Sequence, residues 1–206
     1  MSNTTNEDLQ GTLAPTSDSL TYHPTLREAN ITRQREWDTG NQMTLSYSGN
    51  ELAGEVGEAI EAAAYHSFKP TAVTKANLAD ELGDVVICCD LLAMRYDIPL
   101  PLPPHPLAVP FDREILFAVL VDLAIAAGAV SNIVKKLERE AIGMKGSRST
   151  PGHLADALDT VLVEANDIAA RSGLVLADCV ASKFNATSEK VGLKTRLLSV
   201  ESRDGD

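Results

Sequence analysis

The segment PLPLPPHPLAVP, residues 99–110, constrains the fold of this chain most strongly, because half of its residues are proline. Proline fixes φ and has no backbone N–H, so the segment can form neither an α-helix nor a central β-strand. We expect a stiff and extended linker there. The linker divides the chain into two parts, and each part must supply its own regular structure.

Apolar residues at spacings of three and four predict α-helices on both sides of the linker. The clearest case is the stretch 73–96, where apolar residues recur at these spacings from Leu78 to Leu92. Strand signals are weak throughout the sequence. The prediction is therefore an all-α fold with the architecture of a helical bundle. The other helices are expected over residues 25–37, 45–68, 112–139, 153–172 and 176–190, with Asp112 as an N-cap.

Composition limits the classes of partner that the chain can bind. Only 4% of its 206 residues are aromatic although 44% are hydrophobic, so the core must consist largely of Ala, Val, Leu and Ile. The net charge of −11 argues against binding to a nucleic-acid polymer, which requires a basic surface. A nucleotide substrate remains compatible, because metal ions can bridge carboxylates and phosphates.

The three cysteines and the N-terminus indicate a cytoplasmic protein. Cys88 and Cys89 are adjacent within an apolar stretch and Cys179 leaves an odd number, which favours reduced thiols over a disulfide framework. The N-terminal MSNTTNEDLQ lacks the basic and apolar regions of a secretory signal. No apolar run is expected to be long enough to span a membrane.

Two pairs of segments indicate an internal duplication. Residues 78–100 and 154–176 are identical at eight of 23 positions without gaps, and residues 53–62 resemble residues 127–136 at nearly the same offset. The alternative is that these helices merely share one apolar period. The predicted division is an N-terminal arm at 1–25, a first repeat at 26–98, the linker at 99–111, a second repeat at 112–197 and a tail at 198–206.

Four acids in the first repeat form a candidate metal site. Glu55 and Glu58 share one helical face, as do Glu81 and Asp84 on the next helix. If these helices form an antiparallel hairpin, the four carboxylates converge in one acidic pocket, which Mg²⁺ would neutralise. The alternative is a solvated acidic face, but no Lys or Arg lies three or four residues away from any of them. The second repeat lacks all four acids.

The motifs ExxE at 55–58 and ExxD at 81–84, with their surroundings LAGEVGEA and LADELGDVV, resemble those of the MazG-like all-α nucleoside triphosphate pyrophosphohydrolases. The stretches RQREWDTGNQMTLSYSGN and KFNATSEKVGLKTRL are also similar to phage and bacterial members. The resemblance covers most of residues 27–197, interrupted at the linker. It implies an enzyme that uses Mg²⁺, with Mn²⁺ as a substitute, to hydrolyse an NTP or dNTP to the monophosphate and pyrophosphate.

The resemblance also implies roles for individual residues. The four acids would bind the metals, and Glu55 and Glu58 would be catalytic, with Glu55 orienting or deprotonating the attacking water. Glu51 has no firm counterpart as a ligand. Trp37 and Tyr65 are candidates for stacking on the base, against ordinary packing. The candidate phosphate contacts are Lys135, Lys136, Arg148, Lys183 and Asn185.

The distribution of these residues differs from that in single-repeat relatives, because the acids stand in the first repeat and the basic candidates in the second. We therefore expect a pseudo-dimer in one chain, in which the second repeat supplies phosphate-binding residues and the molecule pairs again as a homo-oligomer. Lys135 and Lys136 cannot both face one site, and Arg148 either clamps a phosphate or keeps its loop soluble. The alternative functions are a non-catalytic nucleotide-binding module and a pyrophosphohydrolase acting on another phosphorylated nucleotide intermediate. The preferred base stays open.

Overall fold

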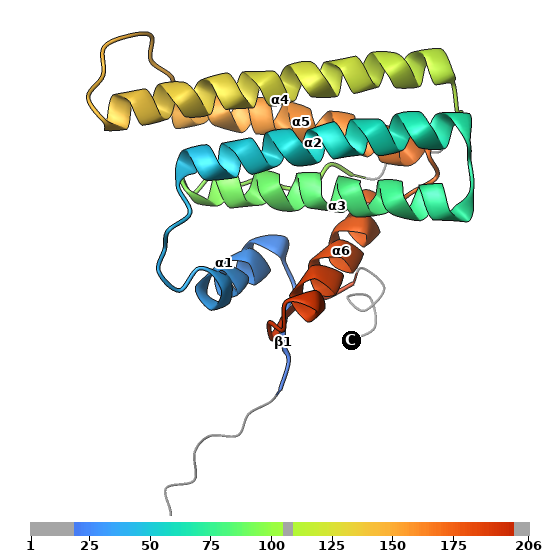
Figure 1. Cartoon of the computed structure of the whole chain (residues 1–206), viewed down its shortest axis with the longest axis horizontal. Coiled ribbons are helices and arrows are strands. Elements are labelled where there is room, and N and C mark those ends of the chain that lie inside the picture. Colours follow the sequence, from blue (N-terminus) through green and yellow to red (C-terminus); the bar gives the residue numbers. More distant parts are fainter. Residues whose placement is uncertain (1–18, 105–108, 200–206) are drawn as a thin grey trace, which may run out of the picture.

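The structure is a computed structural model that describes residues 19–104 and 109–199. Within these residues the chain forms six α-helices and one small sheet (Figure 1), so the all-α prediction is confirmed. The helices are α1 (Leu26–Trp37), α2 (Leu45–Phe68), α3 (Ala72–Met94), α4 (Arg113–Ala141), α5 (Pro151–Arg171) and α6 (Leu176–Lys190).

Side-chain caps explain where most of these helices begin. In five of the six described helices, an N-cap oxygen accepts a hydrogen bond from a backbone N–H of the first turn. α6 follows Val175 and has no such bond. The bounds of α2 and α6 agree with those expected from the sequence, and the other ends lie within about two residues of expectation. The capping residues are Thr25, Thr44, Thr71, Asp112 and Thr150.

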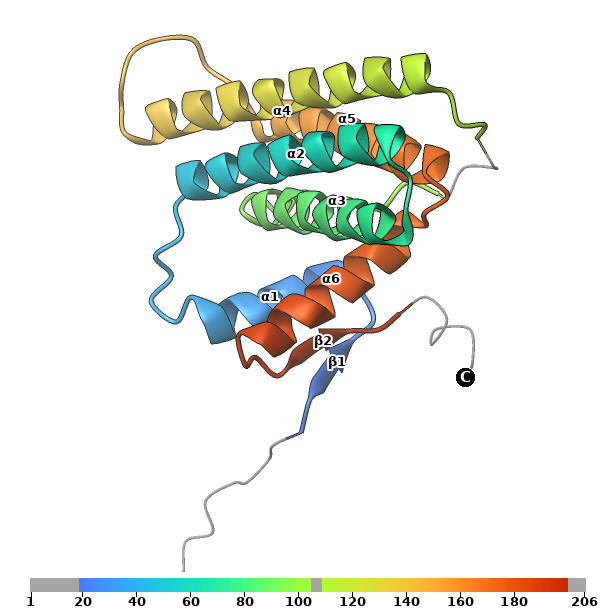
Figure 2. The same cartoon turned by 45° about the vertical axis from the view of Figure 1, so that its right-hand side comes forward.

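The helices form two antiparallel hairpins that pack against each other. α2 lies along α3, and α4 lies along α5; α2 then contacts α4, while α3 contacts α5 (Figures 1 and 2). The core between them consists almost entirely of Leu, Val, Ile, Ala and Cys side chains. The two hairpins correspond to the two proposed repeats, although a shared hairpin arrangement does not by itself establish a duplication.

α1 and α6 both pack against α3, on the side of it away from α4 (Figure 2). Below them runs a parallel pair of short strands, β1 (Thr21–His23) and β2 (Thr195–Leu197), with Thr21 opposite Thr195. The sequence did not predict these strands. The arm expected at 1–25 therefore has regular structure in its last part, while residues 1–18, 105–108 and 200–206, which belong to the arm, the linker and the tail, lie outside the described residues.

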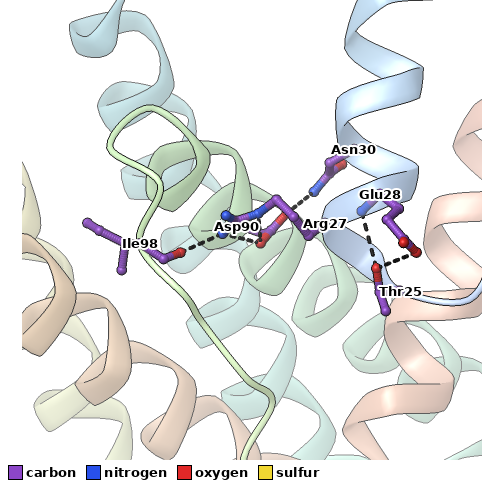
Figure 3. Close-up of polar contacts among 6 residues, drawn as sticks. All are labelled: Thr25, Arg27, Glu28, Asn30, Asp90 and Ile98. Carbon is purple, nitrogen blue, oxygen red and sulfur yellow. Dashed lines mark hydrogen bonds and ion pairs between the residues drawn. The ribbon is translucent and has the colours of Figure 1, made fainter.

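Residues 98–104 of the linker region form neither helix nor strand, and they are attached to the bundle. Asp90 of α3 accepts hydrogen bonds from Arg27 and Asn30 of α1, and the Arg27 guanidinium also donates to the carbonyl oxygen of Ile98 at 2.8 Å (Figure 3). The side-chain amide of Asn166 donates to the Pro104 carbonyl oxygen at 3.0 Å. Residues 98–104 therefore form a strap that is attached to the bundle at both of its ends.

The expectation that no segment can span a membrane needs correction for α4. By length and composition alone, Arg113–Ala141 is apolar enough to cross one. Leu116 and Leu123 are buried in the core of the bundle, Val121 and Ile125 are more than half exposed, and 39% of the apolar stretch is buried in all.

Candidate metal centre

Three of the four predicted acids meet where α2 and α3 lie side by side. Glu55 of α2 and Glu81 and Asp84 of α3 each place one carboxylate oxygen within 4.8 Å of the others. Glu81 and Asp84 are three residues apart, so they share one face of α3. The antiparallel course of the hairpin then brings Glu55 opposite them. All three side chains are half-buried.

Burial and mutual repulsion destabilise the ionised forms of these carboxylates. Burial, together with the charges of Asp84, Glu58 and Glu81, raises the pKa of Glu55 to about 7. Burial likewise raises the pKa of Glu81 and of Asp84. Like charges brought together out of water require a cation to stay ionised. Three carboxylates fit a hard divalent cation such as Mg²⁺, which binds oxygen ligands.

The positive charge next to this cluster comes from Lys183 of α6. Its ammonium group lies 2.7 Å from the Asp84 carboxylate and also forms an ion pair with Asp80. Although burial opposes the charge, the hydrogen bonds that Lys183 donates to Asp80 and Asp84 raise the pKa of Lys183. The sequence predicted Lys183 near the site, but it did not predict the pairing with Asp80.

A glycine on α3 allows α6 to come this close. A Cβ atom on Gly83 would lie 2.7 Å from the Lys183 Cβ and 2.8 Å from the Cys179 carbonyl oxygen. Contacts this short do not occur between real Cβ atoms and their neighbours. Gly83 therefore sets the distance between the two helices, and with it the position of Lys183 beside Asp84.

Two of the three acids, Glu55 and Asp84, line one end of a cavity of about 490 Å³ between α1, α2, α3 and α6. Its polar end contains Glu55, Asp84 and Lys183. Away from that end the walls become apolar and aromatic. The residues of this second end are Trp37, Met43, Tyr47, Ile87 and Leu91. A cavity of this size, with apolar walls and a few convergent charges, is typical of a small-molecule site.

Arg33 of α1 also lines the cavity, and the sequence analysis missed it. Its guanidinium carbon lies 3.8 Å from the centre of the Phe184 ring, and its side chain is almost entirely buried. Burial lowers the pKa of Arg33 to about 10, while the charge of Asp84 opposes that effect. Arg33 precedes Trp37 by one helical turn, so the helical spacing placed it on the same face and could have revealed it.

The structure places the other predicted site residues as follows. Trp37 lines the cavity and is 44% exposed. Glu58 is exposed on α2, outside the three-carboxylate group, although its charge acts on both Glu55 and Glu81. Tyr65 is exposed near the end of α2. The roles of Glu58 and Tyr65 stay predictions.

The basic candidates of the second hairpin lie elsewhere. Lys135 lines a separate cavity of about 340 Å³ between the start of α2 and the end of α4. Lys136 is half-buried on α4, and Arg148 forms an exposed ion pair with Glu140 at 2.9 Å. Asn185 exchanges two hydrogen bonds with the backbone of Leu197, which attaches β2 to α6. Among the described residues, none of these four lines the cavity beside the acids.

No protein-family model, curated protein or solved structure matches this chain. The resemblance to the MazG-like superfamily therefore stays a prediction from the quoted motifs, and the structure adds the arrangement of the residues that carry them. That arrangement is a carboxylate cluster on a helical hairpin, with a lysine and an arginine beside it and an aromatic wall next to it.

Proposed function

We propose that the chain is a Mg²⁺-dependent nucleoside triphosphate pyrophosphohydrolase of the MazG-like type, which converts an NTP or dNTP to the monophosphate and pyrophosphate. The convergence of Glu55, Glu81 and Asp84 carries this proposal. Such a cluster is unfavourable without a cation, and the adjoining cavity has the size and the lining of a nucleotide site. The resemblance of the motifs to that superfamily supplies the reaction.

The proposal gives separate roles to the residues that bind the metal, the phosphates and the base. Glu55, Glu81 and Asp84 hold Mg²⁺, which when bound lowers the pKa of a water and neutralises phosphate charge. Glu55 would also lie close enough to that water to orient it or to accept its proton. Lys183 and Arg33 place positive charge where the triphosphate would enter. The wall around Trp37 accommodates the base.

The test is pyrophosphate release from a panel of NTPs and dNTPs in Mg²⁺. We expect Glu55→Gln and Asp84→Asn to lower kcat/KM by more than about 100-fold, because each removes a ligand charge. Lys183→Met should raise KM about tenfold through the loss of a charge-assisted contact to phosphate. Asp159→Asn, on the exposed side of α5, is the matched control and should behave as the wild type.

Equal activity in wild type and Asp84→Asn would contradict the assigned site. Binding of nucleotide by the wild type without any turnover, measured by calorimetry, would instead indicate a non-catalytic nucleotide-binding module. Release of pyrophosphate only from a modified nucleotide would favour a biosynthetic intermediate as the substrate.

A further inference from the structure

Glu51 is a cavity-lining acid to which the metal centre assigns no role. It precedes Glu55 by one turn of α2, is half-buried and lines the same cavity. It is not a member of the three-carboxylate group. In the described part of the chain it forms no ion pair with a lysine or arginine. A half-buried carboxylate without a cationic partner is free to accept hydrogen bonds from a neutral donor.

The cavity gives Glu51 a defined position between the two ends. Tyr47, Glu51 and Glu55 follow one another at intervals of four residues on one face of α2. With a rise of about 1.5 Å per residue, Glu51 lies about 6 Å along the helix from Glu55, and Tyr47 about 12 Å. Cys88 of α3 also lines the cavity.

Glu51 already has one partner, and its remaining acceptor sites are available. Tyr47 lies one turn before Glu51 on α2, and interaction with the Glu51 carboxylate raises the pKa of Tyr47. A carboxylate offers about four lone-pair sites, so one phenol does not saturate it. The middle level of the cavity therefore presents a carboxylate with acceptor sites available.

The order of groups in a nucleotide matches the order of groups in the cavity. The sugar is bonded between the α-phosphate and the base. With the α-phosphate at Glu55 and Asp84 and the base between Trp37, Met43 and Leu91, the sugar occupies the level of Glu51. Its hydroxyl groups are neutral donors that suit a carboxylate with free acceptor sites. The 3′-hydroxyl is the donor common to ribonucleotides and deoxyribonucleotides.

We propose that Glu51 is a specificity residue whose carboxylate accepts a hydrogen bond from the sugar 3′-hydroxyl of the nucleotide, with Tyr47 holding the carboxylate in place. This inference rests on the proposed function, because it requires a nucleotide in the cavity. It predicts that the protein discriminates against nucleotides that lack a 3′-hydroxyl. Loss of a hydrogen bond to a charged acceptor lowers affinity by about ten- to hundredfold.

The test compares a dNTP with its 2′,3′-dideoxy analogue on wild type, Glu51→Gln and Glu61→Gln. Glu61 is exposed on the same helix and serves as the matched control. For the wild type and the control, we expect kcat/KM to fall at least about tenfold on removal of the 3′-hydroxyl. For Glu51→Gln that ratio should fall severalfold, since the amide oxygen of the variant accepts only a weaker, uncharged hydrogen bond. If Glu51 had a purely structural role, Glu51→Gln would lower kcat/KM equally for both nucleotides. The ratio of the two kcat/KM values would then equal that of the wild type.

Calorimetric binding of the same two nucleotides, with Ca²⁺ in place of Mg²⁺, separates the failure of this inference from that of the proposed function. The wild type could bind the dNTP about tenfold more tightly than the dideoxy analogue and yet hydrolyse neither. That result would contradict the enzymatic function and support the role of Glu51. Turnover with an unchanged ratio in Glu51→Gln would overturn the role of Glu51 alone.

A loss of activity confined to ribonucleotides would assign the 2′-hydroxyl and overturn the 3′ assignment. Weaker Mg²⁺ binding with an unchanged ratio would make Glu51 a metal ligand, and no nucleotide binding at all would overturn both proposals.

Discussion

At the scale of single residues, the ionisation of Glu55 in the metal centre makes the stability of the fold depend on pH. Its pKa of about 7 in the folded protein exceeds its ordinary value of 4.5. Below pH 4.5 the group is protonated in both the folded and the unfolded chain. Between pH 4.5 and 7 only the folded chain retains the proton, so the free energy of unfolding falls as pH rises through this window. Above pH 7 the full cost of the buried charge is present.

Glu55→Gln should therefore reduce the pH dependence of the metal-free protein. We expect the variant to gain about 1 kcal/mol over wild type at pH 8 and little at pH 4, the shift being discounted because the side chain is only half-buried. Urea denaturation in a chelator at both pH values measures this difference. Glu61→Gln, on the exposed side of the same helix, should show the same change in the free energy of unfolding with pH as the wild type. Parallel pH profiles for Glu55→Gln and wild type would contradict the burial of the Glu55 charge.

At the scale of helices, the contact between α3 and α6 determines whether Lys183 can reach the acids. Gly83 lies against the backbone of α6 at Cys179, so a methyl group there cannot be accommodated by rotating a side chain. The two helices would have to separate. Because Lys183 and Phe184 both belong to α6, such a separation would move Lys183 away from Asp84 and Phe184 away from Arg33.

Gly83→Ala should accordingly destabilise the protein by about 1–3 kcal/mol, as overpacking in a tight contact does. It should also raise KM in the pyrophosphate assay through the displacement of Lys183. Gly128→Ala on α4 is the opposite control, because no atom lies within 4 Å of its added Cβ. Alanine there should stabilise the helix by about 0.5–1 kcal/mol. Equal stability in the two variants, measured by urea denaturation, would refute the close contact.

At the scale of the whole molecule, Asp90 joins parts of the chain that are distant in sequence. Its side chain is 5% exposed and lies 2.8 Å from the Arg27 guanidinium, and it also accepts a hydrogen bond from Asn30. Through Arg27 the same network extends to Ile98, where the strap begins (Figure 3). α1, α3 and the strap are therefore connected by one buried carboxylate. Through α1 the network also positions Arg33 and Trp37 in the cavity.

Asp90→Asn should lower the free energy of unfolding by about 3 kcal/mol, because it leaves Arg27 without its buried counter-charge. Asp167→Asn is the matched control. It breaks the ion pair with Arg171 within α5, at 3.0 Å, and should cost about 0.5 kcal/mol. Urea denaturation compares the two variants. If Asp90→Asn lowered the free energy of unfolding no more than the control does, the Asp90 network would not stabilise the packing of these elements.

Much of the helical framework could be predicted from the sequence, because it depends on local signals. Spacings of three and four, together with caps such as Asp112, determined the helices and most of their ends. The spacing of Glu81 and Asp84 determined that they share a face, and the short connection after α2 determined that Glu55 lies opposite. The strands β1 and β2 were not predictable, because three residues contain too little periodicity and their pairing joins the two ends of the described chain.

The sequence by itself determined the helices, the all-α class and the acids that can meet on one hairpin. Only the tertiary structure decided which other side chains join them. Lys183 is 99 residues beyond Asp84, and it reaches the acids because Gly83 lets α6 approach α3. Arg33 and Glu51 acquire their places in the cavity from the packing of α1 against the first hairpin. Such contacts depend on the distances between whole helices, and no local spacing in the chain encodes those distances.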